Sequence, residues 1–148
     1  MKRKDFIKHC GFACAGTIFS TTLFESCLPA KAVTGKIQGD DILVALSDFE
    51  SGTPGNIAFK KYLVITNDLL RFPICVYRHN EKEYTALWMQ CTHQGAELQV
   101  FGDKLQCPAH GSEFSNKGLN ESGPADKELR KFPVSIAGKE LKISLKAI

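Results

Sequence analysis

Two short segments of the sequence each carry one cysteine and one histidine. Cys91 precedes His93 with one residue between them, and Cys107 precedes His110 with two. Thirteen residues separate His93 from Cys107. Thiolate sulfur and imidazole nitrogen are common protein ligands of transition metals, and two of each complete a set of four. The spacing therefore predicts a metal centre held by these four side chains.

Structural zinc and plain core packing are the alternatives to a redox metal. Two cysteines and two histidines suit tetrahedral Zn²⁺, but zinc modules usually pair cysteine with cysteine and histidine with histidine. Here each segment supplies one ligand of each kind. The stretch from Cys91 to Ala125 is rich in glycine, proline, cysteine and histidine and poor in β-branched residues. Because it has little apolar surface to bury, we expect a bound group to hold it.

The rest of the chain must position these segments, and its pattern predicts strands. After residue 33 no stretch shows a sustained helical period. Instead, short apolar, β-branched and aromatic runs recur at residues 42–46, 62–66, 74–77, 84–89, 132–136 and 141–145. Turn residues separate these runs, for example at 51–56 and 102–103. Such spacing is typical of an antiparallel all-β domain, either a sandwich or a small barrel.

Two motifs and a loop resemble the Rieske [2Fe–2S] family. Cys91-Thr92-His93-Gln94-Gly95 and Cys107-Pro108-Ala109-His110-Gly111-Ser112 are similar to its two cluster-binding boxes, and Gly123-Pro124-Ala125 is similar to its proline loop. The resemblance spans roughly residues 36–148. It implies an all-β fold, an antiparallel β-sandwich of three small sheets with an inserted cluster-binding subdomain whose two loops lie within residues 91–125.

The resemblance also implies the cofactor and its ligands. One [2Fe–2S] cluster would be bound, with Cys91 and Cys107 on one iron and His93 and His110 on the other. Replacing two thiolates by neutral imidazoles removes negative charge and raises the reduction potential, so the imidazole-bound iron is expected to take the electron. The function implied is one-electron transfer, with no bond chemistry of its own. Structural zinc remains the alternative that metal analysis would reveal.

Residues near the boxes refine these expectations. High-potential members of the family place a serine and a tyrosine hydroxyl near the cluster. Ser112 fills the first position, whereas Phe114 fills the second and has no hydroxyl. We therefore expect an intermediate potential within the Rieske range of about −150 to +300 mV. Respiratory members also join their boxes by a disulfide at the positions of Ala96 and Ala109, and its absence argues against quinol oxidation.

The N-terminal segment resembles an export signal. Four basic residues among the first eight precede an uncharged stretch from residue 10 to residue 24, which predicts an export signal over residues 1–26. Residues 24–27 resemble a bacterial lipobox that ends at Cys27, and residues 27–35 would then be a linker. The alternatives are cleavage after Ala32, at an A-x-A site, or a retained single-span anchor. The expected location is the bacterial periplasm or a membrane surface, with a lipid on Cys27.

Length, charge and the remaining residues restrict the other functions. A chain of 148 residues suits one domain, which leaves no room for the mononuclear iron domain of an oxygenase subunit. The net charge of +3 comes from 19 basic and 16 acidic residues. Beyond residue 26 there are 15 basic and 14 acidic residues, so that part is nearly neutral and no nucleic-acid partner is expected. We expect Cys75 to be a buried, inert thiol and His79 to be exposed.

Three electron-transfer functions remain open at this point, beside the structural zinc module. The favoured one is an exported, membrane-tethered carrier with redox donor and acceptor proteins as partners. The second is an iron–sulfur subunit of a quinol-oxidising or other oxidoreductase complex. The third, a soluble ferredoxin that serves an oxygenase, fits poorly with an export signal.

Overall fold

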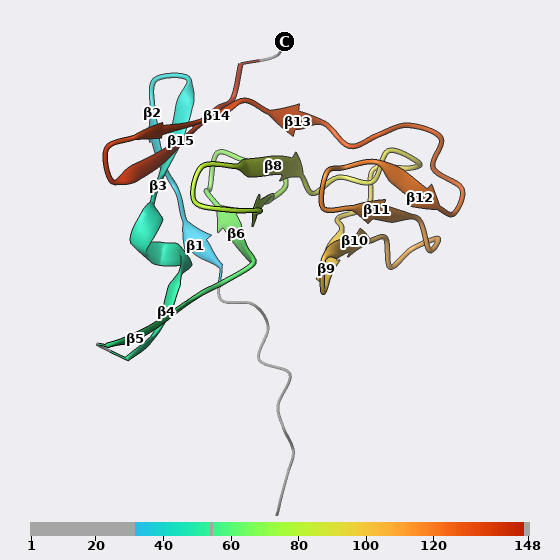
Figure 1. The fold of residues 1–148 in the computed structure, drawn as a ribbon. Helices are drawn as coiled ribbons and strands as arrows, with labels where there is room; N and C mark the ends of the chain where they lie inside the picture. Colours follow the sequence, from blue (N-terminus) through green and yellow to red (C-terminus); the bar gives the residue numbers. More distant parts are fainter. Residues whose placement is uncertain (1–31, 54, 147–148) are drawn as a thin grey trace, which may run out of the picture.

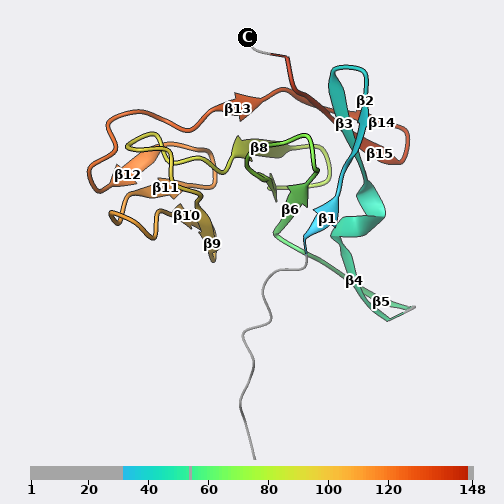
Figure 2. The same ribbon diagram turned by 180° about the vertical axis from the view of Figure 1, so that it is seen from behind.

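Short strands joined by tight turns make up the chain. The computed structural model describes residues 32–53 and 55–146, and the views from the front and from behind show the same arrangement of small sheets (Figures 1 and 2). Within these ranges the only helix is one 3₁₀ turn, Leu46–Phe49. The all-β fold expected from the sequence is confirmed.

Two sheets form the base of the domain. The first has the order β1 (Val33–Thr34), β6 (Tyr62–Thr66), β7 (Ile74–Arg78), β8 (Tyr84–Trp88) and β13 (Lys131–Phe132). The second has the order β14 (Val134–Ala137), β15 (Glu140–Ser144), β3 (Asp41–Ala45) and β2 (Lys36–Gln38). A separate hairpin pairs β4 (Glu50–Thr53) with β5 (Asn56–Phe59). Between the two large sheets lies a core to which β3 contributes Ile42 and Val44 and β15 contributes Leu141 and Ile143.

A third sheet carries the site. It has the order β12 (Asn120–Ser122), β11 (Glu113–Ser115), β10 (Lys104–Gln106) and β9 (Gln99–Phe101), and it is inserted in the chain between β8 and β13. Figure 1 shows this sheet to one side of the base, with β14 and β15 at the opposite side. The two Cys–His segments are the loops that precede β9 and follow β10. An inserted subdomain of two loops is therefore present, as expected.

Strand β7 is buried on both faces and joins the two parts of the domain. Alternate side chains point to opposite faces of a strand. Ile74 and Val76 accordingly pack in the core of the base, while Cys75 and Tyr77 pack in a second core with Leu105 and Phe114 of the inserted subdomain. Leu87 of β8 belongs to the second core as well. The inserted subdomain therefore rests on a rigid, apolar surface.

The structure differs from the sequence-based expectations at a few positions. The run at residues 132–136 is broken, because Pro133 lacks the N–H that a continuous ladder would need; β13 ends at Phe132 and β14 begins at Val134. One strand pair is parallel: Val33 of β1 lies opposite Ile65 of β6. His79 was expected to be exposed but is half-buried, with its Nε2 atom 2.9 Å from Thr85 Oγ1.

The N-terminal predictions fall mostly outside the described residues. The export signal over residues 1–26, Cys27 and the start of the linker over 27–35 lie there. The end of that linker does not: Val33–Thr34 form β1, and Gly35 donates a backbone hydrogen bond to the Thr66 carbonyl oxygen at 3.0 Å. The structured domain thus begins about three residues before the boundary expected at residue 36.

Cys75 provides a prediction about reactivity. Its side chain is fully buried, and burial raises the pKa of the thiol to about 12, although the neighbouring Tyr77 side chain acts in the opposite direction. Alkylating reagents react with the thiolate form of cysteine. We therefore expect mass spectrometry to show no labelling of Cys75 by iodoacetamide at pH 8 in the folded protein, and labelling after unfolding. The thiol of the unfolded chain ionises from about pH 8.5, whereas the buried thiol stays protonated. Above that pH the free energy of unfolding should therefore fall by up to about 1.4 kcal/mol per pH unit, and this fall should be smaller in Cys75→Ala. Rapid labelling of the native protein would contradict this assignment.

Candidate metal centre

The two Cys–His loops share one backbone framework. In the first, the Cys91 N–H donates to the Ala96 carbonyl oxygen at 2.8 Å and the Cys91 carbonyl oxygen accepts from the Gly95 N–H at 2.9 Å. In the second, Cys107 makes the equivalent bonds with Ser112 and Gly111, at 2.8 and 3.0 Å. The two loops therefore close around their cysteines in the same way, although the Cys–His spacing differs.

Both loops turn through a glycine with a left-handed backbone. Gly95 has φ +74° and Gly111 has φ +75°, a region that side-chain-bearing residues adopt only with strain. Each glycine lies four residues after its cysteine, so the loop returns toward the sheet just beyond the histidine. This turn leaves the histidines at the outer end of the subdomain and the cysteines at its inner end.

The fold brings like ligands together. The side chains of Cys91 and Cys107 are buried in the same cluster, close enough that Cys91 lowers the pKa of the Cys107 thiol. The rings of His93 and His110 meet edge to face, with their centroids 4.9 Å apart. Each loop thus contributes one member to a sulfur pair and one member to a nitrogen pair. The sequence-predicted residues are all at one place, sorted by chemistry rather than by position in the chain.

The donor atoms are prepared for a metal. Burial opposes ionisation of the Cys107 thiol, but hydrogen bonds from the backbone N–H groups of His110 and Ala109 and from Cys91 outweigh it, and the pKa of Cys107 lies below its ordinary value. Metals bind the thiolate form, so this environment favours binding. The Nδ1 atom of His93 is buried and has no hydrogen-bond partner among the described residues. An unpartnered buried nitrogen is costly unless it binds something else.

One metal ion does not fit this arrangement. Among residues 32–53 and 55–146, no three side chains of histidine, cysteine, aspartate or glutamate converge so as to hold a single ion. A structural zinc site needs four ligands around one point. Two pairs of ligands instead suit a centre with two metal ions, each bound by one pair, and the [2Fe–2S] cluster with its Cys₂ and His₂ ends is such a centre.

Ser112 ties the proline loop to the second box. It is fully buried, and its Oγ accepts a hydrogen bond from the backbone N–H of Ala125 at 3.1 Å. The carbonyl oxygen of Ala125 in turn accepts from the Nδ2 of Asn120. Because the Ser112 oxygen acts as an acceptor, its own proton is free to be donated to a group between the loops.

Sequence reasoning missed the residues that hold these loops. Asn120 bonds Ala125 from β12, and Thr92 Oγ1 donates to the Lys127 carbonyl oxygen at 2.8 Å, which fastens the first box to the segment after the proline loop. Ordinary polar residues in loops give no signal of such a role, since their partners lie 5 and 35 positions away in the chain. The proline-loop motif was the one clue that this segment approaches the boxes.

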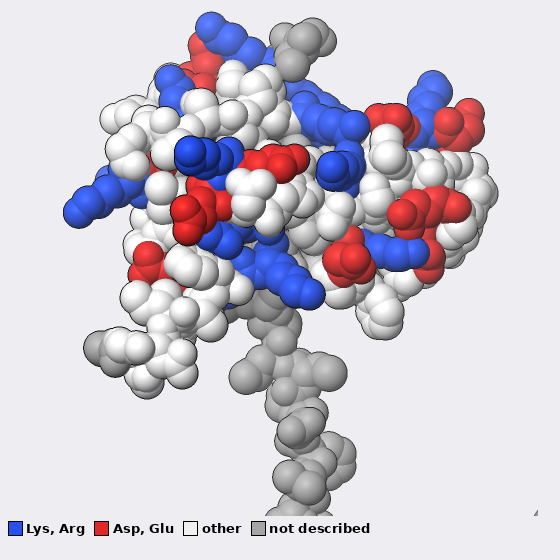
Figure 3. Space-filling model, in the orientation of Figure 1, with Lys and Arg blue, Asp and Glu red and all other residues white. Residues whose placement is uncertain are grey.

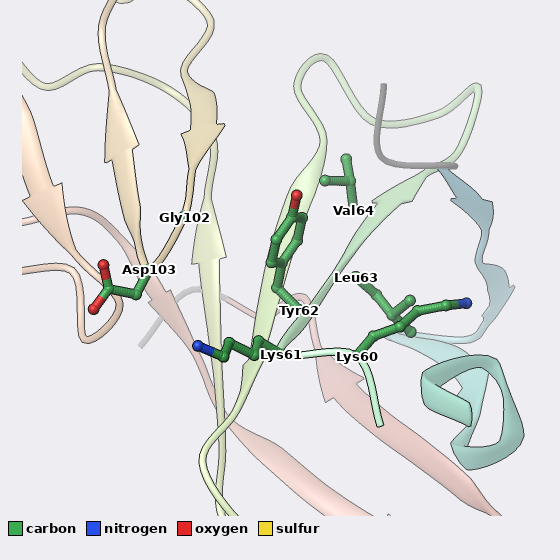
Figure 4. Close-up of a pocket in the computed structure, with 7 residues that line it drawn as sticks. All are labelled: Lys60, Lys61, Tyr62, Leu63, Val64, Gly102 and Asp103. Atoms are coloured by element: carbon green, nitrogen blue, oxygen red, sulfur yellow. The ribbon is translucent and has the colours of Figure 1, made fainter. Parts of the chain in front are cut away.

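Exposure differs between the two ends of the site. The cysteines are buried, whereas His93 is half-buried and His110 is exposed. An open groove of about 520 Å³ lies beside His93. It is lined by Trp88, by residues 90–95, and by Lys127 and Arg130. A larger cavity of about 630 Å³ lies between β6 and the turn at Gly102–Asp103, and none of the four candidate ligands lines it (Figure 4). The histidine end is thus the part of the site that another molecule can approach.

The paired loops, the fold and the donor set define a domain of the iron–sulfur electron-transfer class. The family model described as Rieske [2Fe-2S] domain matches residues 43–133, more than half of the chain. The chain therefore belongs to the Rieske [2Fe-2S] family. It binds one [2Fe–2S] cluster and functions in electron transfer.

One solved structure has a similar fold, and two more match parts of the chain. The cyanobacterial plasma membrane Rieske protein PetC3 from Synechocystis PCC 6803 is 25% identical with a TM-score of 0.50, over 57% of this chain and 86% of that one. A chain from the complex of reduced oxygenase and oxidized ferredoxin in carbazole 1,9a-dioxygenase is 25% identical with a TM-score of 0.49, over 70% and 94%. The Sphingomonas yanoikuyae B1 ferredoxin is 22% identical with a TM-score of 0.44, over 57% and 84%. No curated protein matches the chain.

Phe114 provides a prediction about the reduction potential. Its ring is fully buried and packs in the same core as Cys91 and Cys107. A tyrosine hydroxyl at this position would donate a hydrogen bond that stabilises the reduced cluster more than the oxidised one. We expect Phe114→Tyr to raise the potential by about 40 mV for each kcal/mol of that preference, measured by protein-film voltammetry. An unchanged potential in a folded, cluster-containing variant would contradict this role.

Proposed function

We propose that the chain is an exported, membrane-tethered one-electron carrier in which Cys91 and Cys107 bind one iron of the cluster and His93 and His110 bind the other. Ser112 donates its free proton toward the cluster. The observation that carries the proposal is the arrangement of the candidate ligands. Each loop carries one cysteine and one histidine, and the fold places the two thiols together on the inside and the two imidazoles together on the outside.

The residues divide the work of electron transfer among them. When bound, the cluster accepts and releases one electron at a time. The environment of Cys107 lowers the pKa of its thiol, which favours metal binding, and the two buried cysteines would hold one iron of the cluster. The half-buried His93 and the exposed His110 would hold the other iron, on the side where a partner can come close. The short loops and the Ala125 contacts hold this geometry in place.

The tether rests on the N-terminal sequence and on one neighbour. A basic head, an uncharged stretch and Cys27 follow one another as in a lipoprotein signal, and the Synechocystis neighbour is named as a plasma membrane protein. Cys27 lies six residues before Val33, the first residue of β1. Six extended residues span about 20 Å, so a lipid on Cys27 would keep the domain close to the bilayer. In the part of the chain that the structure describes, no helix has the length and hydropathy to span a membrane.

A carrier is favoured over a quinol-oxidising subunit by the two boxes. Ala96 and Ala109 stand where the respiratory branch has its disulfide, and the free cysteines among the described residues are Cys75, Cys91 and Cys107. Purification of a stable complex that reduces the cluster with quinol would support the subunit instead.

Cell fractionation tests the tether. We expect the full-length protein in the membrane fraction, released by detergent but not by high salt, and we expect Cys27→Ala to move to the soluble periplasmic fraction. Cys14→Ala is the matched control, because Cys14 lies inside the expected signal, and it should behave as the unchanged protein does. If Cys27→Ala stays with the membranes, a retained anchor replaces the lipid in this proposal.

A further inference from the structure

The groove beside His93 has the chemistry of a docking surface. Its walls are residues 91–95 of the first box, the half-buried ring of Trp88 and the side chain of Gln90, whose Oε1 accepts from the Trp88 Nε1–H at 2.9 Å. Lys127 and Arg130 complete the lining. Trp88 is held edge-on by Phe72 and Phe132, with ring centroids 5.9 and 5.7 Å away. A fixed aromatic wall next to a candidate ligand is a surface on which another molecule can rest.

The charged lining of this groove is positive. Lys127 and Arg130 line it, and no carboxylate does. Neither cation forms an ion pair among the described residues, whereas the nearby Lys131 is paired with Glu128 at 2.9 Å. The guanidinium of Arg130 lies over the Phe132 ring, 4.7 Å from its centroid, which holds the charge at the edge of the groove. On the face shown in Figure 3, basic and acidic side chains are interspersed, also around β13 and the segment that leads into it.

The position of Lys127 is fixed relative to the first box. The hydrogen bond from Thr92 to the Lys127 carbonyl oxygen joins the two segments, so the backbone of Lys127 stays beside the first box, and its side chain lines the same groove as His93. Asp126 and Glu128 flank Lys127 in the sequence and Glu97 follows the first box, but none of the three lines the groove. A partner that covers the histidine end must therefore place its own surface against two unpaired cations.

We infer that the redox partner of this chain is a protein that docks an acidic surface into the groove between the first box and Lys127–Arg130. This inference rests on the proposed function, because it takes the histidine end as the place where electrons leave. Complementary charge steers the encounter and fixes its orientation. Carboxylates on the partner would also compensate for the hydration that Lys127 and Arg130 lose on docking.

Two inorganic oxidants of opposite charge test the sign of this surface. The reduced protein is mixed with ferricyanide, an anion, or with tris(phenanthroline)cobalt(III), a cation, and each takes one electron from the cluster in a stopped-flow experiment. At about 10 mM ionic strength, where charges interact over roughly 30 Å, we expect Lys127→Glu to slow oxidation by ferricyanide about tenfold and to speed oxidation by the cobalt complex. Lys127→Gln should change the two oxidation rates about threefold, each in the same direction as Lys127→Glu does. Both effects should vanish at 1 M salt.

The control variant is Lys139→Glu. It makes the same change of net charge in the turn between β14 and β15, at the opposite side of the molecule from β9–β12 (Figure 1). We expect it to leave both rates within a factor of two. Equal effects of Lys127→Glu and Lys139→Glu would overturn the inference, since net charge alone would then act. So would unchanged rates in a Lys127→Glu protein that retains its EPR signal.

A second measurement uses proteins as oxidants. An acidic blue-copper protein should oxidise the reduced chain faster at low salt than a basic c-type cytochrome does, and Lys127→Glu should reverse that order. A faster reaction with the basic protein in the unchanged chain would contradict an acidic partner while leaving the cluster assignment intact. Absence of any cluster signal from the unchanged chain would instead remove the proposed function, and this inference with it.

Discussion

His110→Cys is expected to lower the reduction potential of the cluster by about 300 mV or more. The variant replaces a neutral imidazole by a thiolate and so adds a negative charge to the cluster, which makes electron uptake less favourable. Ligation by four thiolates places plant-type ferredoxins near about −400 mV, well below the Rieske range. His110 is exposed, so the exchange should not disturb the fold.

The measurement is a redox titration followed by EPR. His79→Gln is the matched control, because His79 lies on the base of the domain and bonds Thr85 rather than a box residue. We expect the potential of this control to stay within about 30 mV of the unchanged protein, which corresponds to less than 1 kcal/mol. A potential that is unaffected by His110→Cys would show that His110 is no ligand.

Gly123→Ala is expected to destabilise the site by about 2–4 kcal/mol. Gly123 has φ +88°, which costs an L residue roughly 1–2 kcal/mol. A Cβ atom there would also lie 2.5 Å from the Cα of Ser112 and 2.8 Å from the carbonyl oxygen of Gly111. These are backbone atoms and cannot move aside, so the proline loop must lift from the second box. We expect faster cluster loss on dilution with chelator and a lower unfolding temperature.

Gly138→Ala separates strain from contact. Gly138 also has a positive φ, +63°, but an added Cβ would meet nothing within 4 Å. We expect this variant to lose only the conformational part, about 1 kcal/mol, and to keep its cluster as long as the unchanged protein does. Equal rates of cluster loss in the two variants would mean that the loop does not protect the site.

Much of the fold followed from the period of the apolar residues. The run at residues 62–66 coincides with β6, and the alternation of Leu141 and Ile143 with polar residues describes β15 as it stands in the second sheet. Periodicity could not show that β7 is buried on both faces, because that depends on the inserted sheet packing against Cys75 and Tyr77. Pro133 marks the break between β13 and β14 in the sequence. The apolar residues on both sides of it nevertheless favoured one continuous strand.

The candidate ligands are a prediction from the sequence, whereas their arrangement could not be predicted from it. The spacing of Cys91, His93, Cys107 and His110 gives two unlike pairs, and the family resemblance alone implied that like ligands share an iron. The structure places the thiols together and the imidazoles together because two loops with the same backbone hydrogen bonds lie side by side at the end of the sheet where β9 begins and β10 ends. Contacts made across the chain, such as those of Asn120 and Thr92, leave no trace in a local pattern.

The most direct test of the central claim is the EPR spectrum of the reduced protein, with iron, zinc and acid-labile sulfide measured on the same sample. We predict the signal of one [2Fe–2S] cluster per chain, with iron and sulfide in equal amounts and no zinc. A colourless protein without inorganic sulfide after anaerobic reconstitution, or one that holds stoichiometric zinc, would contradict the binuclear site formed by the two loops.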